Sequence, residues 1–588
     1  MAPQGHAPPS GSVSVRRPRH TRLAGSGRRL RVALALTAGW LVVAYLVAPL
    51  VIAALYRGEL DVRHPQLAEE LAAAQARASL EQHLGEWRWF AIWPAVAALV
   101  WCGYALLLAN RRLVARHVHG ATATSLAGLR LAVCGSALLV TLCEHLPSVA
   151  DLPPEMAGRM GTMSLLAALP GCDRLLASAG ALAMLQALTA ALLVAALVGW
   201  RTRVTLPAAT VAYFLLSGIL RLYSRLFHVG LTPLYLLIVL CFTPAGDALS
   251  LDRRRRLRAA EPLAGPEDPQ PIYGWSRYAV WTVLALVYFE AGLSKLRDGG
   301  LLWWHPVNLR TLLYRDSLAP MAFDFDWGLA LAPAPDALFA LLGLSALAVE
   351  LVYPVVLVSR RARRWVPAVT AALHLGILLF QNVAFFDLLL LQVLFYDLRR
   401  LLGRRVAVPP SVPVGADARE ETAAPGAARG LRRLVALFLL AWSARLELYP
   451  LSAMQMYADR ETSGEVEYVH VLVRRASGQV TRAPLEEAIP ALADSRYRWT
   501  LDRLFEGGEA DRRTARRYLR AAARAYNRRA ASEERIESFD VRKYRWRFLS
   551  PQSMPPATET PGELIGREVV SAAEEPPARV QVEAARGG

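Results

Sequence analysis

The sequence predicts an all-α polytopic membrane protein with about 11 transmembrane helices, followed by a small α+β extramembrane module near the C-terminus. Two observations predict this class. Hydrophobic residues make up 54% of the 588 positions and charged residues only 20%, and the apolar residues come in blocks separated by clusters of arginine. Because a spanning helix needs about 20 mostly apolar residues, blocks of that length indicate helices that cross a bilayer.

Eleven apolar segments account for the expected spans. They lie near positions 31–56, 89–109, 125–146, 178–200, 204–222, 229–249, 274–296, 336–358, 365–382, 383–398 and 431–449. The adjacent segments 365–382 and 383–398 are short, so the pair could also be one broken or re-entrant element.

The arginines predict the orientation of these spans. Several of them precede the first span, which places the N-terminus in the cytoplasm by the positive-inside rule. When the spans are counted onward, each loop on the cytoplasmic side also receives arginines: Arg111, Arg112 and Arg116, then Arg201 and Arg203, then Arg253, Arg254, Arg255 and Arg256, then Arg360, Arg361, Arg363 and Arg364, then Arg399, Arg400, Arg404 and Arg405. The loops 57–88 and 144–173 on the other side are acidic or mixed. We therefore expect an integral, multi-pass protein of the plasma membrane whose surroundings are the lipid bilayer.

The net charge of +18 raises the question of a nucleic-acid partner. A protein that binds nucleic acid gathers its basic residues on one face of a soluble module. Here the arginines alternate with apolar helices instead. The charge pattern therefore predicts no nucleic-acid partner.

Composition divides the chain into five regions. We expect a disordered basic cytoplasmic arm at 1–30, two transmembrane helices at 31–121, a larger transmembrane domain at 122–456, a small extracytoplasmic α+β module at 457–549 and a disordered tail at 550–588. Within the module, apolar residues alternate with polar ones over 465–473 and aromatic residues share one parity over 536–548, which predicts two strands. Helical periodicity covers 485–505 and 510–530.

The five cysteines show no C-x-x-C spacing and lie in or beside apolar segments. They are Cys102, Cys134, Cys143, Cys172 and Cys241. This placement is typical of buried small hydrophobic residues, so no disulfide framework and no metal site are expected.

Lysine is the scarcest charged residue of the chain and therefore the first candidate for chemistry. Of 67 basic residues only Lys295 and Lys543 are lysines. An arginine stays protonated, whereas a lysine amine removed from water can lose its proton and act as a base. Lys295 lies at the end of an apolar segment, which makes it the candidate catalytic base. The alternative is that an arginine-rich composition left two lysines by chance and that Lys295 snorkels to the headgroups.

Two histidines and two carboxylates also lie within or at the ends of spans, where polar groups are costly and often functional. His228 opens the sixth span and His374 lies near the middle of the ninth, so both could share a site with Lys295. Each could equally be a core histidine bonded to a neighbouring helix. Glu290 and Glu350 must be protonated or paired at their depth, and structural pairing is the alternative to a functional role.

A pair of tryptophans follows Lys295 closely. Trp303 and Trp304 could mark the membrane interface, where tryptophan is common. They could also cover a pocket for a flat ring.

Several motifs of the chain, taken in order, resemble the HTTM domain of the vitamin K-dependent γ-carboxylase family. The run A-G-L-S-K-L at 291–296 with the following tryptophan pair resembles the family's lysine-bearing helix. The other landmarks are L-A-G-L-R ending at Arg130, His228 followed by an apolar segment and the S-L-D of Ser250 to Asp252, E-L-V-Y-P starting at Glu350, and His374 with Leu375. The resemblance covers about 122–400, and we expect the HTTM-like domain to extend to Met456, over 122–456.

The resemblance implies a quinol-linked, oxygen-dependent reaction of the carboxylase and epoxidase type. In the carboxylase, the lysine of the A-G-x-K-K-L run deprotonates reduced vitamin K, which makes a strong base that takes a proton from a glutamate so that CO2 can add. Lys295 would have that role here, with His228 and His374 as polar groups around it. A reduced, vitamin K-like quinone would be the cofactor, held by Trp303, Trp304 and Glu290.

The chain also departs from the family pattern, which supports a second hypothesis. Ser294 stands where the carboxylase has a first lysine, and the outer module is far smaller than the carboxylase's luminal portion. HTTM domains also occur in bacterial membrane proteins that do not carboxylate, including one that helps to mature a secreted peptide toxin. The alternative function is therefore a non-catalytic membrane factor for maturation or export of a secreted peptide or protein, which would bind on the outer face.

Overall fold

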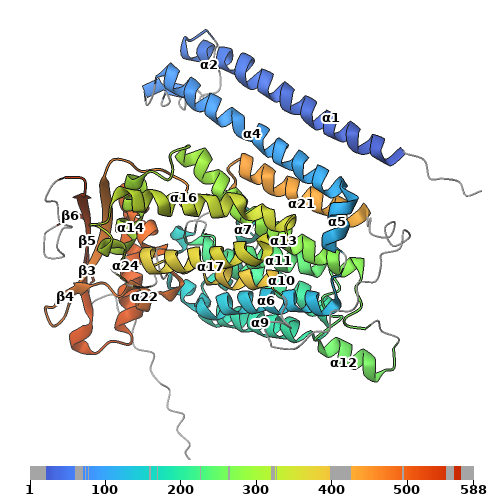
Figure 1. Cartoon of the computed structure of the whole chain (residues 1–588). Coiled ribbons are helices and arrows are strands. Elements are labelled where there is room, and N and C mark those ends of the chain that lie inside the picture. Colours follow the sequence, from blue (N-terminus) through green and yellow to red (C-terminus); the bar gives the residue numbers. More distant parts are fainter. Residues whose placement is uncertain are drawn as a thin grey trace, which may run out of the picture. The chain divides into compact units, whose positions relative to one another are not determined.

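The structure is a computed structural model of a mostly helical chain (Figure 1). It describes residues 21–59, 71–72, 75–76, 79–118, 120–157, 161–168, 170–224, 227–261, 265–319, 323, 325, 327–396, 425–492, 496–550 and 562–570. The chain divides into two compact units, Met1–Asn110 and Arg111–Gly588.

The first unit is a helical hairpin. Helix α1 (Thr21–Val42) continues through a π-helical turn (Val43–Val47) into α2 (Ala48–Tyr56), and α4 (Leu80–Ala109) returns beside them. Two indole nitrogens join the arms, because Trp40 Nε1 donates to Ala91 O at 2.8 Å and Trp87 Nε1 donates to Ala44 O at 2.7 Å.

The start of α1 corrects the predicted arm at 1–30. Residues 1–20 lie outside the described part of the chain, but the helix begins at Thr21. Once the apolar segment has nucleated a helix, each added residue costs little, and arginine is a good helix former. The basic stretch from residue 21 to residue 30 therefore extends the first helix.

The second unit contains most of the helices. In chain order they are α5 (Arg111–Val118), α6 (Ala123–Cys143), α7 (Gly161–Ala167), α8 (Cys172–Leu176), α9 (Ala179–Val198), α10 (Thr202–Leu222), α11 (Leu231–Cys241), α12 (Leu251–Arg258), α13 (Pro271–Gly299), α14 (Pro306–Leu318), α15 (Trp327–Ala330), α16 (Asp336–Val352), α17 (Ala362–Gln381), α18 (Phe386–Leu391) and α21 (Pro425–Ser443). Helix α13 is central. It packs against α5, α6, α11, α16 and α21, and 83% of its most apolar window is buried.

Local sequence fixes where several of these helices begin and end. Helix α6 starts at a capping box, in which Thr122 accepts from Ser125 N and Ser125 accepts from Thr122 N. Such a cap satisfies amide groups that have no partner in the first turn. Helix α9 ends at Gly199, whose φ of 72° suits glycine, and α13 starts with Pro271 in its first turn.

Seven helices in the described residues are long and apolar enough to cross a membrane. They are Arg31–Tyr56, Leu80–Ala109, Ala123–Cys143, Ala179–Val198, Thr202–Leu222, Pro271–Gly299 and Asp336–Leu357. Helices α17 and α21 have the length of a span but begin with arginines. The two adjacent short segments expected at 365–382 and 383–398 are the 20-residue helix α17 and the short apolar segment Phe386–Phe395.

The expected span at 229–249 is wrong in its extent. Its helix, α11, has only 11 residues and ends at Cys241. At about 1.5 Å per residue, it is much shorter than a hydrocarbon core of about 30 Å. Pro244 explains the early end, because a proline disfavours helix at the residue before it.

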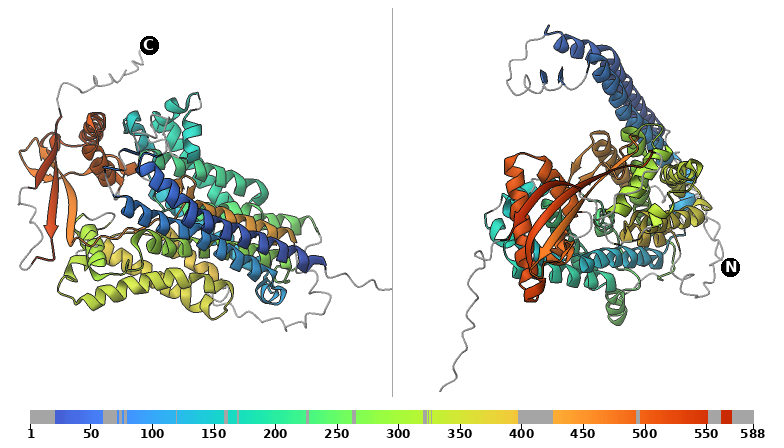
Figure 2. Two further views of the ribbon diagram at one scale, coloured as in Figure 1. Left: turned by 90° about the horizontal axis from the view of Figure 1, so that it is seen from above. Right: turned by 90° about the vertical axis from the view of Figure 1, so that its left-hand side faces the viewer.

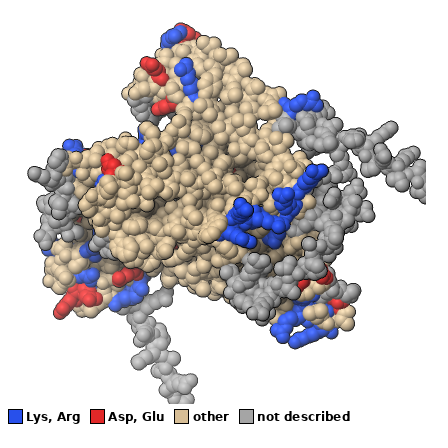
Figure 3. All heavy atoms as spheres, in the orientation of Figure 1, with Lys and Arg blue, Asp and Glu red and all other residues tan. Residues whose placement is uncertain are grey.

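The helices of the second unit have two chemically distinct ends. At one end Arg360 Nη2 donates to Arg116 O at 3.2 Å, which joins the start of α17 to α5. At the other end Trp303 Nε1, just after α13, donates to Tyr457 O at 2.8 Å. Figure 3 shows a broad uncharged surface on this unit, with charged side chains gathered near α12 and near the sheet. The hydrogen bond from Arg360 to Arg116 O shows that the arginine clusters at 111–116 and 360–364, both expected in the cytoplasm, lie at the same end of this unit.

A four-stranded antiparallel sheet lies across the second of these ends (Figure 2). Its strand order is β4-β3-β5-β6, with β3 (Glu465–Arg475), β4 (Val480–Arg482), β5 (Ile536–Arg547) and β6 (Glu563–Val569). The two expected strands, β3 and β5, are confirmed. They pair with Tyr468 opposite Tyr544, whose rings stack at 5.2 Å.

Two expectations for this region are corrected. Strand β6 falls in the expected disordered tail, where 551–561 and 571–588 lie outside the described residues. The free edge of β5 explains why β6 forms, because an unpaired edge offers a row of backbone donors and acceptors.

The expected helix at 485–505 is instead α22 (Leu485–Ala488), a 3-10 turn (Pro490–Leu492) and α23 (Arg496–Glu506). Pro490 explains the break. Helix α24 (Glu509–Asn527) matches the second expected helix.

The sheet packs directly on the helices rather than standing apart. Val466, Tyr468, Tyr544 and Trp546 of β3 and β5 belong to one hydrophobic cluster with α14, and the ring centroids of Tyr314 and Trp546 are 5.3 Å apart. A shared core of this kind holds the module in a fixed position on the helix ends.

The outer face of the sheet carries a network of ion pairs around the second lysine. Lys543 Nζ lies 2.8 Å from Glu467 and 2.9 Å from Glu506, and Arg545 lies 2.5 Å from Glu467. The Lys543 ammonium, and then the Arg545 guanidinium, hold the pKa of Glu467 below its usual value. Glu467 is 38% exposed, so solvent screening keeps the contribution of these pairs to stability small.

Substitution of Gly274 tests the packing of α13 on α5. A Cβ at Gly274 would lie 2.0 Å from Val118 O, which is backbone and cannot move aside cheaply. We expect Gly274→Ala to destabilise the fold by about 1–3 kcal/mol or more, as overpacking does. Gly376→Ala in α17 is the matched control, because no atom lies within 4 Å of its added Cβ, and it should be neutral or stabilising by up to about 1 kcal/mol. Equal thermal unfolding midpoints for the two variants would contradict this packing.

The pH dependence of Glu467→Gln tests the ion-pair network. A carboxylate whose folded pKa is depressed contributes stability above its unfolded pKa and loses it as the pH falls through the folded pKa. We expect the variant to be less stable than wild type by up to about 1 kcal/mol at pH 7, and the difference to disappear as the pH falls below the lowered pKa of Glu467 in the folded state. Glu537→Gln, at an exposed position of β5, is the control. A difference that persists unchanged at low pH would show that Glu467 does not act through charge.

Candidate functional site

A segment that follows α21 crosses the helix ends beneath the sheet. We call residues 445–461 the strap. It accepts hydrogen bonds from three buried side chains of the helices: Tyr235 OH bonds Pro450 O at 2.6 Å, Ser294 Oγ bonds Ala453 O at 2.8 Å and Trp303 Nε1 bonds Tyr457 O at 2.8 Å. The strap therefore closes the end of the bundle where α13 finishes.

Lys295 is buried under this strap. It is 5% exposed, and its Nζ donates to Glu350 Oε1 of α16 at 2.8 Å and to Met456 O of the strap at 3.2 Å. The ring of Trp303 lies 5.3 Å from Nζ, which is a cation–π distance. The amine thus does not snorkel to a surface. It has one carboxylate, one carbonyl and one aromatic face as neighbours.

Gly292 allows the two helices that carry this pair to approach. A Cβ at Gly292 would lie 3.0 Å from the Glu350 Cβ and 3.1 Å from a methyl carbon of Leu351. The small residue one turn before Lys295 therefore sets the distance between α13 and α16.

The other oxygen of Glu350 is not satisfied. Oε2 is buried and has no hydrogen-bond partner among the described residues. A buried acceptor without a partner costs about 1–3 kcal/mol, so such an atom in a well-packed region indicates a place for a donor from a ligand or water. Glu350 Oε2 can therefore accept one further hydrogen bond.

His228 lies at the strap, but its bonds orient it toward Ser452. Its Nε2 lies 2.9 Å from Ser452 Oγ, and that hydroxyl donates to Glu447 at 3.1 Å. Because a hydroxyl has one proton, the imidazole must donate from Nε2. Arg221 holds the loop by donating to Phe227 O and Val229 O on either side of His228.

His374 belongs to a separate buried polar chain. Tyr353 OH donates to Gln392 Oε1 at 2.7 Å, Gln392 Nε2 donates to Tyr288 OH at 2.8 Å, and Tyr288 OH lies 2.7 Å from His374 Nε2. Since Tyr288 accepts from Gln392, its own proton goes to His374 Nε2. The proton of the neutral imidazole is then on Nδ1, which is buried and has no partner among the described residues.

The structure brings some of the expected site residues together and separates others. Lys295 contacts Trp303 directly, whereas His228 bonds Ser452 and His374 bonds Tyr288. Trp304 instead packs against α16, where its Cα would lie 3.0 Å from a Cβ at Gly343. Glu290 is fully buried, and neither of its carboxylate oxygens has a hydrogen-bond partner among the described residues. It lies about 140° around the helix from Lys295, because successive residues turn about 100°.

Sequence reasoning missed the partners that come from other helices. Glu350 was identified as a buried carboxylate but not as the partner of Lys295, and Ser452, Tyr288 and Gln392 were not identified. Tyr288 gave one signal, since it lies seven residues before Lys295 and so shares its face of α13. Nothing in the sequence indicated the strap contacts.

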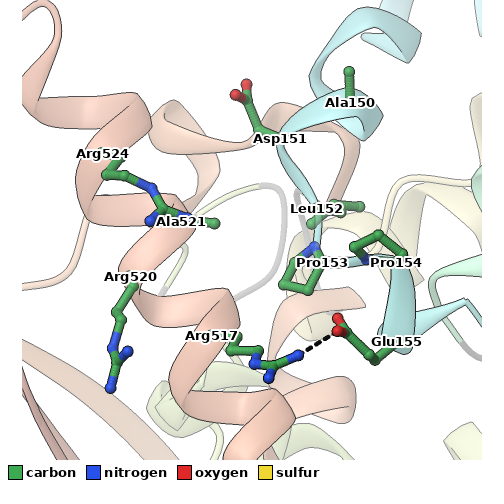
Figure 4. Close-up of a pocket in the computed structure, with 10 residues that line it drawn as sticks. All are labelled: Ala150, Asp151, Leu152, Pro153, Pro154, Glu155, Arg517, Arg520, Ala521 and Arg524. Carbon is green, nitrogen blue, oxygen red and sulfur yellow. Dashed lines mark hydrogen bonds and ion pairs between the residues drawn. The ribbon is translucent and has the colours of Figure 1, made fainter. Parts of the chain in front are cut away.

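A cavity of about 640 Å³ lies apart from Lys295, between α24 and the residues that follow α6 (Figure 4). One wall carries Arg517, Arg520 and Arg524 of α24, and the other carries the turn around Pro153 and Pro154. The charged lining makes this cavity unlike the apolar surroundings of Lys295.

Comparisons with protein-family models, with curated proteins and with solved structures find no significant match. The resemblance to the HTTM domain therefore rests on the sequence motifs alone.

Double substitution tests whether Lys295 and Glu350 act as a buried pair. Lys295→Met leaves Glu350 buried without its partner, which should destabilise the fold by about 3–5 kcal/mol. Adding Glu350→Leu should recover most of that loss, because two apolar side chains can replace a buried ion pair at little cost. Lys543→Met, which removes the partly exposed lysine of the ion-pair network on the sheet, should cost no more than about 1 kcal/mol. Thermal unfolding of the purified variants measures all three. If the double variant is as unstable as Lys295→Met alone, the two side chains are not coupled.

Proposed function

We propose that this protein is an integral membrane enzyme in which Lys295 and Glu350 transfer protons to and from a lipid-soluble quinol. It would cross the plasma membrane about 11 times, with its N-terminus in the cytoplasm and the sheet-bearing module outside. One observation carries the proposal: a buried amine contacts a buried carboxylate at 2.8 Å, and the second carboxylate oxygen has no partner among the described residues.

The residue that would meet a hydroxyl-bearing ligand is Glu350, whose Oε2 can accept from one hydroxyl group. The ring of Trp303, which is 2% exposed, lies beside the Lys295 amine. When bound, a reduced vitamin K-like quinone would supply oxygen-dependent oxidation and a strong base. These are the properties that the motif resemblance predicts for the cofactor.

The surroundings of the pair suit proton transfer. The pair can exist as ammonium and carboxylate or, after proton transfer, as neutral amine and carboxylic acid. Burial penalises both charges, so the free-energy difference between these two forms is smaller in this site than in water. Glu350 can take a proton through Oε2 while Oε1 keeps its contact with Lys295. Met456 O and Ala453 O hold the strap over this end of α13, which excludes bulk water.

The alternative is a non-catalytic membrane factor that matures or exports a secreted partner. The cavity beside α24 favours this alternative specifically, because it lies on the module and away from Lys295. The two functions differ in which residue they need. The enzyme needs the Lys295 amine, whereas the partner-binding factor needs the module.

An assay of quinol oxidation tests the enzymatic proposal. Membranes that contain the protein would be incubated with reduced vitamin K and oxygen, and quinone epoxide would be measured by chromatography. Loss of the base should lower the rate by about 100-fold or more in Lys295→Ala, and Glu350→Gln should also lower it. Lys543→Ala is the matched control, since it removes the other lysine, which lies on the sheet and is 20% exposed, and it should keep the wild-type rate.

Two results would overturn the enzymatic proposal. The first is wild-type protein that forms no epoxide above empty membranes. The second is a Lys295→Ala variant that is folded and retains the wild-type rate. In either case the alternative remains, and its test is whether removal of the module abolishes the biological activity.

A further inference from the structure

The end of the second unit that lies away from the strap carries a group of arginines where α5 meets the start of α17. Arg360 Nη2 donates to Arg116 O at 3.2 Å, so the two helices are in direct contact there. All members of the group except Arg363 are exposed. We call the following six residues the arginine junction: Arg112, Arg116, Arg360, Arg361, Arg363 and Arg364.

Buried contacts hold the arginine junction in a fixed geometry. Arg363 is 9% exposed, and it donates from Nη2 to His117 Nδ1 at 2.9 Å and from Nη1 to Val356 O at 2.8 Å. Its guanidinium lies 4.8 Å from the centroid of the Trp281 ring of α13. Arg277, also on α13, donates to His117 O at 3.2 Å. Helices α5, α13 and α17 therefore meet at one preformed place.

The positive charge of the junction is not balanced. None of its six arginines forms an ion pair with an acidic side chain in the described parts of the chain. Arg363, the buried member, contacts a carbonyl, an imidazole and an indole ring instead. Because a buried charge is costly unless it is paired, and cations close together repel one another, the junction needs a counter-ion.

The start of α17 adds to this excess of positive charge. The N-terminal end of a helix carries a partial positive charge, which favours acidic side chains and anions. The first turn of α17 contains no acidic residue. Four arginines, at positions 360, 361, 363 and 364, lie at or just before this end. An anion from outside the chain would therefore be stabilised by the guanidinium groups and by the helix.

The surface beside the junction indicates where that anion comes from. Arg361, Trp365 and Val369 follow one another at intervals of four residues, so they share one face of α17. Trp365 is 71% exposed and Val369 is 50% exposed. A phospholipid can place its phosphate on the arginines and its acyl chain along these two apolar side chains, and an exposed tryptophan is typical of the membrane interface. A free phosphate ion would use the arginines alone.

We propose that the arginine junction binds the phosphate of an anionic phospholipid, with guanidinium groups of α5 and α17 on either side of it. The proposal rests on the membrane placement proposed above, in which this end of the bundle faces the cytoplasm, where the leaflet is rich in anionic lipid. It does not depend on the chemistry of Lys295. The bound lipid supplies the negative charge that the first turn of α17 lacks and joins α17 to α5.

Native mass spectrometry of the full-length protein in detergent micelles tests this proposal. The probe is dioleoyl-phosphatidylglycerol, and dioleoyl-phosphatidylcholine is the neutral control with the same acyl chains. Arg116→Gln and Arg361→Gln should each weaken phosphatidylglycerol binding about fivefold, the factor that about 1 kcal/mol per arginine gives, and should leave phosphatidylcholine binding unchanged. Neither side chain forms a hydrogen bond with the described residues, so both variants should fold.

Arg256→Gln is the matched control for loss of one positive charge. Arg256 lies in α12, is expected on the same side of the membrane, and already pairs with Asp247 at 2.9 Å. Its loss should leave phosphatidylglycerol binding close to that of wild type.

Four results would overturn the proposal: the two lipids bind alike, Arg116→Gln and Arg361→Gln bind phosphatidylglycerol as wild type does, Arg256→Gln loses as much as they do, or inorganic phosphate at equal concentration competes as well as the lipid does. The measurement uses neither quinol nor Lys295, so a negative epoxide assay and a negative lipid result are separate findings. Binding of neither lipid would also contradict the proposed membrane placement.

Discussion

The buried contact between Lys295 and Glu350 constrains the whole end of the helix bundle. Removing either charge from water is expensive, so each must keep the other within bonding distance. That requirement fixes α13 against α16, needs the small Gly292 between them, and brings Met456 of the strap over the amine. The rest of the site follows, because the strap that covers Lys295 also orients His228 through Ser452.

The strap connects the apolar helices of the second unit to the module that contains the sheet. Its backbone carbonyls accept from Tyr235, Ser294 and Trp303, and the chain then enters β3 directly. The sheet in turn shares a core with α14, while the Arg496–Glu144 pair fixes the far side of the module. The strap therefore connects the module that carries the cavity beside α24 to the helix that carries Lys295.

The lengths of the apolar segments predicted most of the long helices, and the alternation of apolar and polar residues predicted β3 and β5. Both patterns are local in the sequence. The signals failed where tertiary contacts decide. Pro244 shortened α11, Pro490 divided the expected helix at 485–505, and β6 formed because β5 offered a free edge. The site shows the same limit. Periodicity indicates which face of α13 carries Lys295, but which residue of α16 meets that face depends on helix packing. The pairing of His228 with Ser452, 224 positions later, lies beyond any local pattern.

The contacts of Lys295 differ from those of the buried arginines of the second unit. The buried Arg130 is surrounded by the carbonyls of Ala245, Ala248 and Leu249, and Arg221 likewise donates to several backbone oxygens. A guanidinium has five N–H groups and needs such a set, whereas an ammonium has three. At Lys295 the neighbours are one carboxylate oxygen, one carbonyl and one aromatic face, which match three donors. The compact ammonium of Lys295 uses Glu350 Oε1, Met456 O and the Trp303 ring, and it leaves Glu350 Oε2 without a partner among the described residues.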